Sequence, residues 1–368
     1  MNWCLIAGLC LCLANTQARG EKPPAKAYPD GQLRGVWCAP PKATKREQGA
    51  PEVAATLDKL KACGLNTLFV WTESLYAASL LRSDLAKPDP RAAWDGLGEM
   101  VKAAKERGMQ VHVWYSPWIY KDIGRGVELR EHPDWAAVSA KGVADKDGIC
   151  LARPEVRRFE LELLTGLVNR YPDLAGIHIE EPGYNWGGPY CFCEYCKQLC
   201  RDLYGSDIVA DPKAARPLLD HLAASTCTDF IIRLRQMLTA KRPQAWLSAN
   251  GSTGAGADAD WRIGRDWLTW ARRGYIDFYV PQVYTQSVND FYTGGLKTKE
   301  VLGPCDLVVG LAVSWSSIYP KRQEPEVIRG EIGAARKLGA KGFVVYHVDH
   351  FQPQHFDAIR EAISRHSQ

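Results

Sequence analysis

Eight short apolar runs, each followed by a longer amphipathic stretch, constrain the fold of this 368-residue chain more than any other feature. The apolar runs cover residues 35–39, 67–71, 110–115, 176–180, 246–249, 278–283, 307–313 and 343–348. The amphipathic stretches cover 52–63, 91–107, 154–171, 214–241, 261–273, 289–301, 325–338 and 353–366. Alternation of strand and helix is typical of a parallel sheet, and eight such units close into a barrel. The sequence therefore predicts an α/β fold, a single-domain (β/α)8 TIM barrel.

Glycines stand where several of the predicted helices end. Gly64, Gly108, Gly274 and Gly339 each follow an amphipathic stretch directly. Glycine adopts a left-handed conformation without steric cost, so it is the residue that most often turns a helix end back into the next strand.

The N-terminal residues are expected to be a secretory signal. Residues 1–20 hold an apolar run at 5–13, followed by small residues around Ala18, where a signal peptidase would cleave. Residues 21–33 are rich in Pro, Lys and Gly and are interpreted as a linker, which leaves 34–368 for the barrel domain. The mature protein is expected to be secreted or periplasmic.

Charge and composition limit the classes of partner. The net charge is only +4 and the basic residues are interspersed with acidic ones, which argues against nucleic acid. No stretch approaches the roughly 18 apolar residues of a membrane span, and no glycine-rich phosphate loop indicates an organic cofactor. The 13 Trp and 15 Tyr residues suit a surface that packs against sugar rings.

The fourth apolar run ends in two adjacent carboxylates, Glu180 and Glu181. The carboxyl ends of barrel strands form the face on which barrel enzymes place their active sites. Side chains alternate along a strand, so His178 and Glu180 share one face and Glu181 stands just past the strand. Repulsion between two such groups, together with partial burial, can hold one of them protonated near neutral pH, as a general acid requires. The pair is therefore the candidate catalytic centre.

Most of the chain from Arg34 onward resembles the glycosyl hydrolase-like family 10 domain. The similarity rests on the segments at 34–37, 66–71, 176–181, 281–284 and 342–346. In that family the fourth strand usually ends in a pair of Asp followed by an aromatic residue, whereas this chain has Glu180, Glu181 and Pro182. The resemblance implies a TIM-barrel glycoside hydrolase.

A shorter region is similar to the family 42 β-galactosidases. Residues 150–157 and the Cys-x-Cys-x-x-Cys motif at 191–196 match the region in which those enzymes bind structural zinc. There the fourth strand ends in Asn-Glu and the Glu is the acid/base, a role that falls by position on Glu181. The nucleophilic Glu expected after the seventh strand is absent, because 307–313 leads into Ser314 and Trp315.

A hydrolase of the usual kind needs a second carboxylate about 5 to 9.5 Å from the first. Asp349, after the eighth predicted strand, and Glu73, after the second, are the candidates. An acetamido group of the substrate could also replace a protein nucleophile. Other residues near strand ends are expected to form hydrogen bonds with the sugar or to stack on it. They are Trp71, Glu73, Tyr115, Trp118, His178, Tyr184, Asn250, Gln282, Tyr284, Trp315 and His347.

The cysteines allow two interpretations. Of 12 cysteines, nine lie beyond the predicted signal, so they cannot all pair. Cys191, Cys193 and Cys196 are spaced to take three corners of a zinc tetrahedron, with Cys150 as the fourth ligand or, failing that, Cys200. Export into an oxidising compartment would favour disulfides instead. A zinc ion at Cys150, Cys191, Cys193 and Cys196 would be structural, since four thiolates leave no open position for water.

These features predict a glycosidase that cleaves a polysaccharide or cell-wall glycan, with Glu181 as general acid and Glu180 positioning substrate or sharing the proton. Two alternatives stay open. The missing seventh-strand nucleophile allows a carbohydrate-binding barrel without catalysis, and the fold also permits chemistry at a non-sugar centre.

Overall fold

The computed structural model describes residues 26–81, 92–117, 132–184, 191–314 and 322–364. Eight parallel strands form a closed barrel in the order β1-β10-β9-β8-β7-β6-β3-β2. They are β1 (Leu33–Cys38), β2 (Thr67–Glu73), β3 (Gln110–Ser116), β6 (Gly176–Ile179), β7 (Trp246–Gly251), β8 (Phe278–Pro281), β9 (Asp306–Ala312) and β10 (Gly342–Tyr346). Each coincides with a predicted apolar run, so the (β/α)8 TIM barrel is confirmed.

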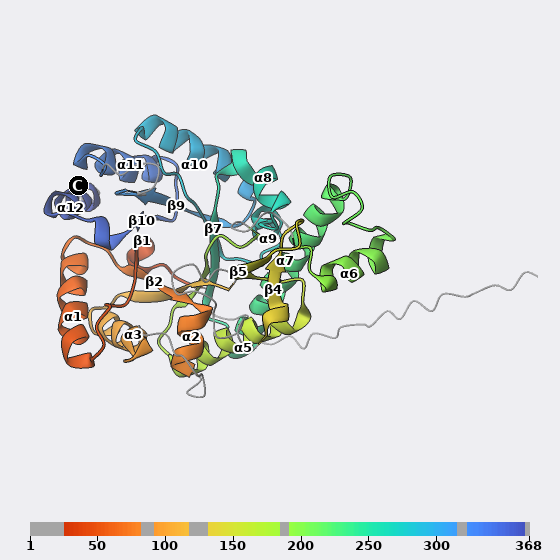
Figure 1. The fold of residues 1–368 in the computed structure, drawn as a ribbon. Helices are drawn as coiled ribbons and strands as arrows, with labels where there is room; N and C mark the ends of the chain where they lie inside the picture. Colours follow the sequence, from red (N-terminus) through yellow and green to blue (C-terminus); the bar gives the residue numbers. More distant parts are fainter. Residues whose placement is uncertain (1–25, 82–91, 118–131, 185–190, 315–321, 365–368) are drawn as a thin grey trace, which may run out of the picture.

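Helices surround the barrel (Figure 1). Those predicted from the sequence are α1 (Arg46–Ala62), α3 (Gly96–Glu106), α5 (Pro154–Arg170), α7 (Arg216–Lys241), α10 (Val288–Leu302), α11 (Pro325–Lys337) and α12 (Pro353–Ser364). Where the sequence predicts one helix over 261–273, the structure has α8 (Ala257–Arg262) and α9 (Trp267–Arg272). Gly264 lies between them with φ of +96°, which ends the helical path.

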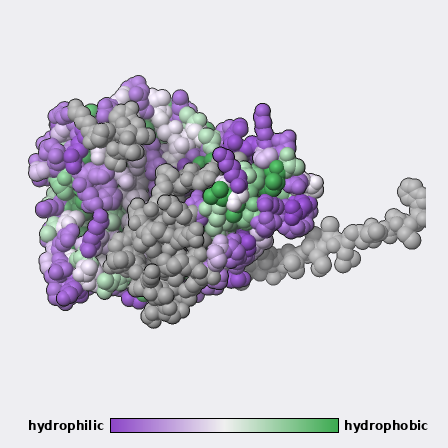
Figure 2. Space-filling view, in the orientation of Figure 1, coloured by the Kyte–Doolittle hydropathy of each residue, from purple (hydrophilic) through white to green (hydrophobic). Residues whose placement is uncertain are grey.

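Four further elements lie in stretches for which the sequence predicts neither helix nor strand. They are α2 (Ser74–Leu81), the antiparallel pair β4 (Ala136–Val138) and β5 (Ala144–Ile149), and α6 (Glu194–Tyr204). Figure 1 shows α6 at one edge of the molecule, beside α7. Hydrophobic surface gathers at that edge (Figure 2), where Leu203 is 60% exposed.

The barrel interior is packed with aromatic and aliphatic side chains. Alternate residues of each strand point inward, and the interior set comprises Leu33, Trp37, Phe69, Trp114, Trp246, Phe278, Val280, Val308 and Val344. The intervening residues pack outward against the helices in a second, larger core. Most positions on both faces of the strands are therefore apolar, as expected for a buried parallel sheet, and His112, His178 and Ser248 are buried polar exceptions.

The amino-terminal end of the barrel is closed by a segment that the sequence reading treats as linker. The ring of Tyr28 stacks on Trp246 with centroids 4.7 Å apart, and its hydroxyl donates to Asp306 at 2.8 Å. Lys26 forms an ion pair with Asp277 at 2.7 Å. Residues 26–32 thus belong to the folded unit. Among the described residues, no helix is long and apolar enough to cross a membrane.

Candidate active site and cysteine cluster

Glu180 follows β6 at the carboxyl end of the barrel. Its backbone N–H donates to Tyr115 O at 2.9 Å, which extends the β6 pairing by one residue and aims the side chain inward. Oε2 of Glu180 accepts hydrogen bonds from Trp114 Nε1, on β3, and from Asn250 Nδ2, on β7, the latter at 2.6 Å. Two neighbouring strands therefore fix this carboxyl group.

Glu181 takes a different path. Its φ of +30° lies in the left-handed region, which is uncommon for a residue with a side chain. Asn250 Oδ1 accepts from its backbone N–H at 2.7 Å, so one amide side chain holds both glutamates. Arg265 Nη2 lies 3.4 Å from Glu181 Oε2 and is itself buried, with 6% side-chain exposure.

The surroundings of Glu180 change its ionisation. Burial, followed by the negative charge of Glu181, raises the pKa of the Glu180 carboxyl to about 8. The hydrogen bonds from Asn250 and Trp114 and the charge of Arg265 act in the opposite direction but do not prevail. At neutral pH the proton therefore resides on Glu180, which can act as an acid.

Aromatic rings surround the Glu180 carboxyl. Trp71, half-buried at the end of β2, contacts Trp114 edge to face at 4.4 Å. Tyr346, on β10, lies 6.3 Å from Trp114 and 5.8 Å from Tyr284. Burial first, then the charge of Glu180, raises the pKa of both tyrosine hydroxyls. Four aromatic side chains, two of them predicted from the sequence, thus meet at this end of the barrel.

The end of β10 adds two predicted residues to the same face. His347 lies 6.2 Å from Trp114, ring to ring. Its Nδ1 lies 3.7 Å from an Asp349 carboxylate oxygen, and the Asp349 side chain is 75% exposed. Burial lowers the pKa of His347 to about 4, although the Asp349 charge acts to raise it. Asp349 also contributes to the raised pKa of Tyr346, as both glutamates do.

Two residues predicted to bind substrate, Tyr115 and His178, lie elsewhere. Tyr115 is fully buried and donates to Glu160 Oε2 at 2.6 Å, so it faces α5, outside the barrel. His178 is buried inside the barrel, where Nδ1 pairs with Ser248 Oγ at 2.8 Å. Both faces of a buried strand are apolar, so sequence alternation alone could not separate inward from outward residues.

The remaining predicted residues have simpler placements. Glu73 is buried, with 2% exposure, and shares the inward face of β2 with Trp71. Gln282 is half-buried just after β8, where its N–H donates to Gly251 O at 2.8 Å. Trp118 and Trp315 lie outside the described residues.

Three residues of the site were not predicted from the sequence. Trp114 and its neighbour Tyr115 are both aromatic, and the sequence does not show which of the two faces inward. Tyr346 belongs to the segment that carries the family resemblance. Arg265 lies between α8 and α9, and no local pattern predicts that its guanidinium reaches Glu181.

The four predicted metal ligands do come together. Ligand atoms of Cys150, Cys191, Cys193 and Cys196 all lie within 4.8 Å of one another, and all four residues are buried. Cys150 Sγ lies 3.4 Å from Cys196 Sγ and 3.8 Å from Cys193 Sγ. These thiols are free, so the disulfide alternative is not realised in the structure.

The cluster geometry fits a metal ion. A tetrahedron with metal–sulfur bonds of about 2.3 Å separates its sulfurs by about 3.8 Å, close to the spacings found here. Hydrogen bonds within the cluster lower the pKa of the Cys191 and Cys193 thiols and raise that of Cys150 and Cys196, so the four thiols share protons closely. Cys193 immediately precedes α6 and Cys150 follows β5, so the cluster joins these two elements.

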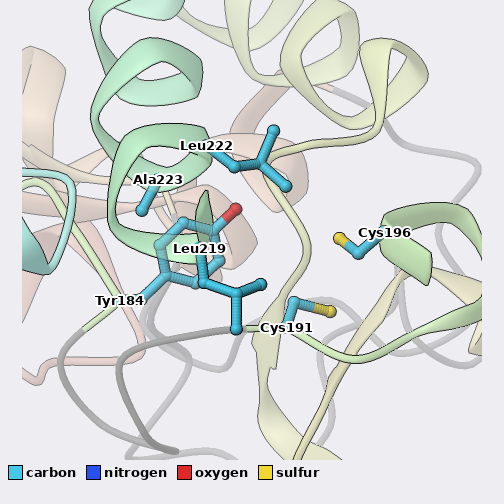
Figure 3. A pocket seen from close by; sticks show the side chains of 6 residues that line it. All are labelled: Tyr184, Cys191, Cys196, Leu219, Leu222 and Ala223. Carbon is cyan, nitrogen blue, oxygen red and sulfur yellow. The ribbon is translucent and has the colours of Figure 1, made fainter. Parts of the chain in front are cut away.

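A small pocket lies beside the cluster (Figure 3). Tyr184, Leu219, Leu222 and Ala223 line it together with Cys191 and Cys196. Tyr184 was predicted to stack on a sugar, but its ring packs between α7 and the cysteines, and its N–H donates to Ile263 O at 2.7 Å. The segment from Glu181 to Tyr184 thus connects the carboxylates to the cluster.

Solved structures with this fold include several glycosidases. The β-galactosidase from Rahnella sp. R3 superposes with a TM-score of 0.68 at 14% identity, over 93% of this chain and 57% of that enzyme. The PgaB (BpsB) glycoside hydrolase domain from Bordetella bronchiseptica superposes with a TM-score of 0.62 at 13% identity, over 90% and 98%. For the α-L-fucosidase isoenzyme 2 from Paenibacillus thiaminolyticus, with a TM-score of 0.61 at 15% identity, the alignment covers 91% of this chain and about half (49%) of that one. At these identities the likeness is one of fold.

Sequence comparison is more specific. Glycosyl hydrolase DigH of Escherichia coli (strain K12) is 24% identical over 330 residues, which cover 75% of this chain and 72% of DigH. DigH of Shigella flexneri matches to the same extent. The family model described as Glycosyl hydrolase-like 10 matches residues 32–302, well over half of the sequence. The chain therefore belongs to the glycosyl hydrolase-like 10 family.

Proposed function

We propose that this protein is an exported glycosidase that hydrolyses glycosidic bonds in a polysaccharide or cell-wall glycan. One observation carries the proposal. Two adjacent carboxyl groups at the active face of a TIM barrel have opposite environments, since Glu180 is held protonated while Glu181 faces a buried arginine. A pair of titratable groups whose surroundings separate their ionisation is the arrangement that acid/base catalysis requires.

The roles follow from these surroundings. Glu180 donates its proton to the leaving glycosidic oxygen, because it retains that proton at neutral pH. The Glu181 carboxylate, beside the Arg265 guanidinium, stabilises the oxocarbenium-like transition state. This assignment differs from the one that the family 42 resemblance implies, in which Glu181 is the acid. Trp71, Trp114 and Tyr346 offer ring faces on which a sugar could stack.

Asp349 is the better placed of the two candidates for the second carboxylate. Its side chain is exposed, so it can reach a substrate or a water, whereas Glu73 is buried. Tyr346 lies within the electrostatic influence of Glu180, Glu181 and Asp349, which supports their sharing one face of the barrel.

We also propose zinc as the metal of the four-cysteine cluster. Four thiolates in a tetrahedron are typical of structural zinc and leave no position for substrate. The ion would anchor β5 to the start of α6, and through Tyr184 it would brace the segment that follows Glu181.

The test is release of reducing sugar from a panel of bacterial, algal and plant polysaccharides and peptidoglycan glycan strands by the mature protein. Variants Glu180→Gln and Glu181→Gln are compared with Glu106→Gln, an exposed glutamate at the end of α3, just before the amino end of β3. We expect losses of about 100-fold or more for the first two, as is typical for acid/base groups, and none for the third.

Binding of the same glycans is followed in parallel. Binding without release by the unaltered protein would favour the non-catalytic carbohydrate-binding alternative. Release that survives both glutamine substitutions would contradict the assigned roles. N-terminal sequencing of the protein recovered from the medium or periplasm tests export, with cleavage expected near Ala18.

A further inference from the structure

Arg265 stands out among the residues that neither the sequence nor the family comparison assigns. It lies between α8 and α9 and is only 5% exposed. Burying a guanidinium removes it from water at a cost of several kcal/mol unless other groups compensate it. Here the compensating groups are the carboxylate of one aspartate and the oxygens of the turn that carries Glu181.

The anchor is Asp260, on α8. Its Oδ1 lies 2.9 Å from Arg265 Nη1, and both side chains are almost fully buried. Its Oδ2 accepts from Ser252 Oγ at 2.6 Å, from Ser252 N at 3.0 Å and from Trp267 Nε1 at 3.0 Å. With these bonds made, Asp260 is fixed in place and so is the arginine fork that it orients.

The rest of the fork points at the Glu181 turn. Arg265 Nε donates to Pro182 O at 3.2 Å, and Nη2 donates to Glu181 O at 3.3 Å. Nη2 also faces the Glu181 carboxylate at 3.4 Å. Arg265 thus contacts both carbonyls of a turn whose first residue has a positive φ, as well as the charged group that the turn presents.

We propose that Arg265 is a positioning residue for the hydrolytic pair, which holds Glu181 as an oriented anion and acts on Glu180 through it. The inference rests on the proposed function and deepens it. A Glu181 carboxylate held in one orientation presents its charge to Glu180 from a fixed position, and the nearby Arg265 charge acts to lower the pKa of Glu180.

The charged and titratable groups around Glu180 define the expected response. They are Glu181 on the same segment, Arg265, Tyr284 after β8 and Tyr346 on β10. Removing the positive charge of Arg265 destabilises the state in which both glutamates are ionised. Glu180 should therefore lose its proton at a higher pH, by about one unit for a charge at this range.

The experiment uses the mature protein labelled with [5-13C]glutamate, in which the Glu180 resonance is assigned by its absence in Glu180→Gln. Its titration is compared in the unaltered protein, Arg265→Met and Arg265→Lys. Arg262→Met serves as a matched control, because Arg262 lies three residues earlier, at the end of α8, is half exposed and pairs with an exposed aspartate. Thermal unfolding of each variant verifies that it is folded.

We expect the Glu180 titration to move up in Arg265→Met and to stay in place in Arg262→Met. Arg265→Lys keeps the positive charge and should restore the titration midpoint of Glu180. If Arg265→Met is too unstable to titrate, Arg265→Gln takes its place in the comparison. On a substrate that the protein hydrolyses, Arg265→Met should lower kcat about 100-fold with little change in KM.

An unmoved Glu180 titration in a folded Arg265→Met protein would overturn the proposal, as would a kcat loss that Arg265→Lys does not partly restore. The titration requires no substrate. A shifted titration with no hydrolysis of any glycan would therefore leave the role of Arg265 standing and contradict the glycosidase function instead.

Discussion

Glu180 and Glu181 are neighbours in the chain, yet the fold gives their side chains different surroundings. Glu180 continues the line of β6 and so points into the barrel, toward Trp114 and Asn250. Glu181 lies past the last strand pairing, where its backbone turns into the left-handed region and its side chain meets Arg265. A difference of one residue at a strand end thus gives one glutamate a raised pKa and places the other beside a buried arginine.

The first prediction concerns the pH dependence of kcat/KM. A general acid must be protonated, and the pKa of Glu180 is raised to about 8 by burial and by Glu181. We expect kcat/KM to fall as the pH rises through about 8, and the fall to begin at lower pH in Glu181→Gln, which lacks the repelling charge. Measurement of kcat/KM from pH 5 to 10 checks this. A decrease that already begins near pH 5 would contradict it.

Glu331, on α11, gives a second prediction, which concerns stability. Burial raises the pKa of this fully buried carboxyl to about 9. A folded pKa above the unfolded one gives stability that is present in acid and lost as the pH rises from about 4.3 through about 9. Glu331→Gln cannot ionise, so its Tm should vary less over this range and exceed that of the unaltered protein at pH 9.

The matched control is Glu326→Gln, one turn earlier on the same helix, where the side chain is 74% exposed. Its curve of Tm against pH should follow that of the unaltered protein. Equal curves for all three proteins would refute the buried ionisation.

At the scale of elements, the eight strands could be predicted because each is a short apolar run between helix-forming stretches. The break between α8 and α9 could not, since Trp261 to Arg273 has apolar residues at helical spacing throughout. Packing decides the break, because a Cβ atom at Gly264 would lie only 3.0 Å from the Cys227 sulfur. That break places Arg265 beside Glu181.

The cysteine cluster gives the prediction for elements. Cys193→Ser should lower zinc affinity by at least about 100-fold, and the mature protein should otherwise carry one zinc per chain. Tm should fall while the barrel remains folded, because the cluster joins β5 to α6 at the periphery. Zinc analysis and circular dichroism measure both effects.

Cys305→Ser is the control, since Cys305 is a partly exposed thiol outside the cluster. It should retain the metal. A protein purified without metal, with unchanged stability after chelation, would refute the zinc assignment.

The molecule as a whole has two different barrel ends. The carboxyl end carries the glutamates, and the amino-terminal end is closed by Tyr28 on Trp246. Tyr28→Ala should lower the free energy of unfolding by about 2–3 kcal/mol, because it removes a partly buried ring and its bond to Asp306.

Tyr28→Phe keeps the ring and should lose about 1 kcal/mol. Urea unfolding measures both variants. Since the ring lies at the end away from the carboxylates, kcat should be unchanged. A kcat that falls in parallel with stability would contradict this separation of the two ends.

The sequence alone determined the barrel, the eight strands, the carboxylate pair and the four clustered cysteines. Each of these depends on residues close together in the chain or on a repeating pattern, which hydrophobic periodicity and motif spacing record directly. The tertiary structure decided which glutamate holds the proton and which aromatic rings surround it. Those properties depend on Trp114, Asn250 and Arg265, which reach Glu180 and Glu181 from β3, from β7 and from the α8–α9 junction. Ionisation responds to distance in space, and only the closed barrel sets that distance.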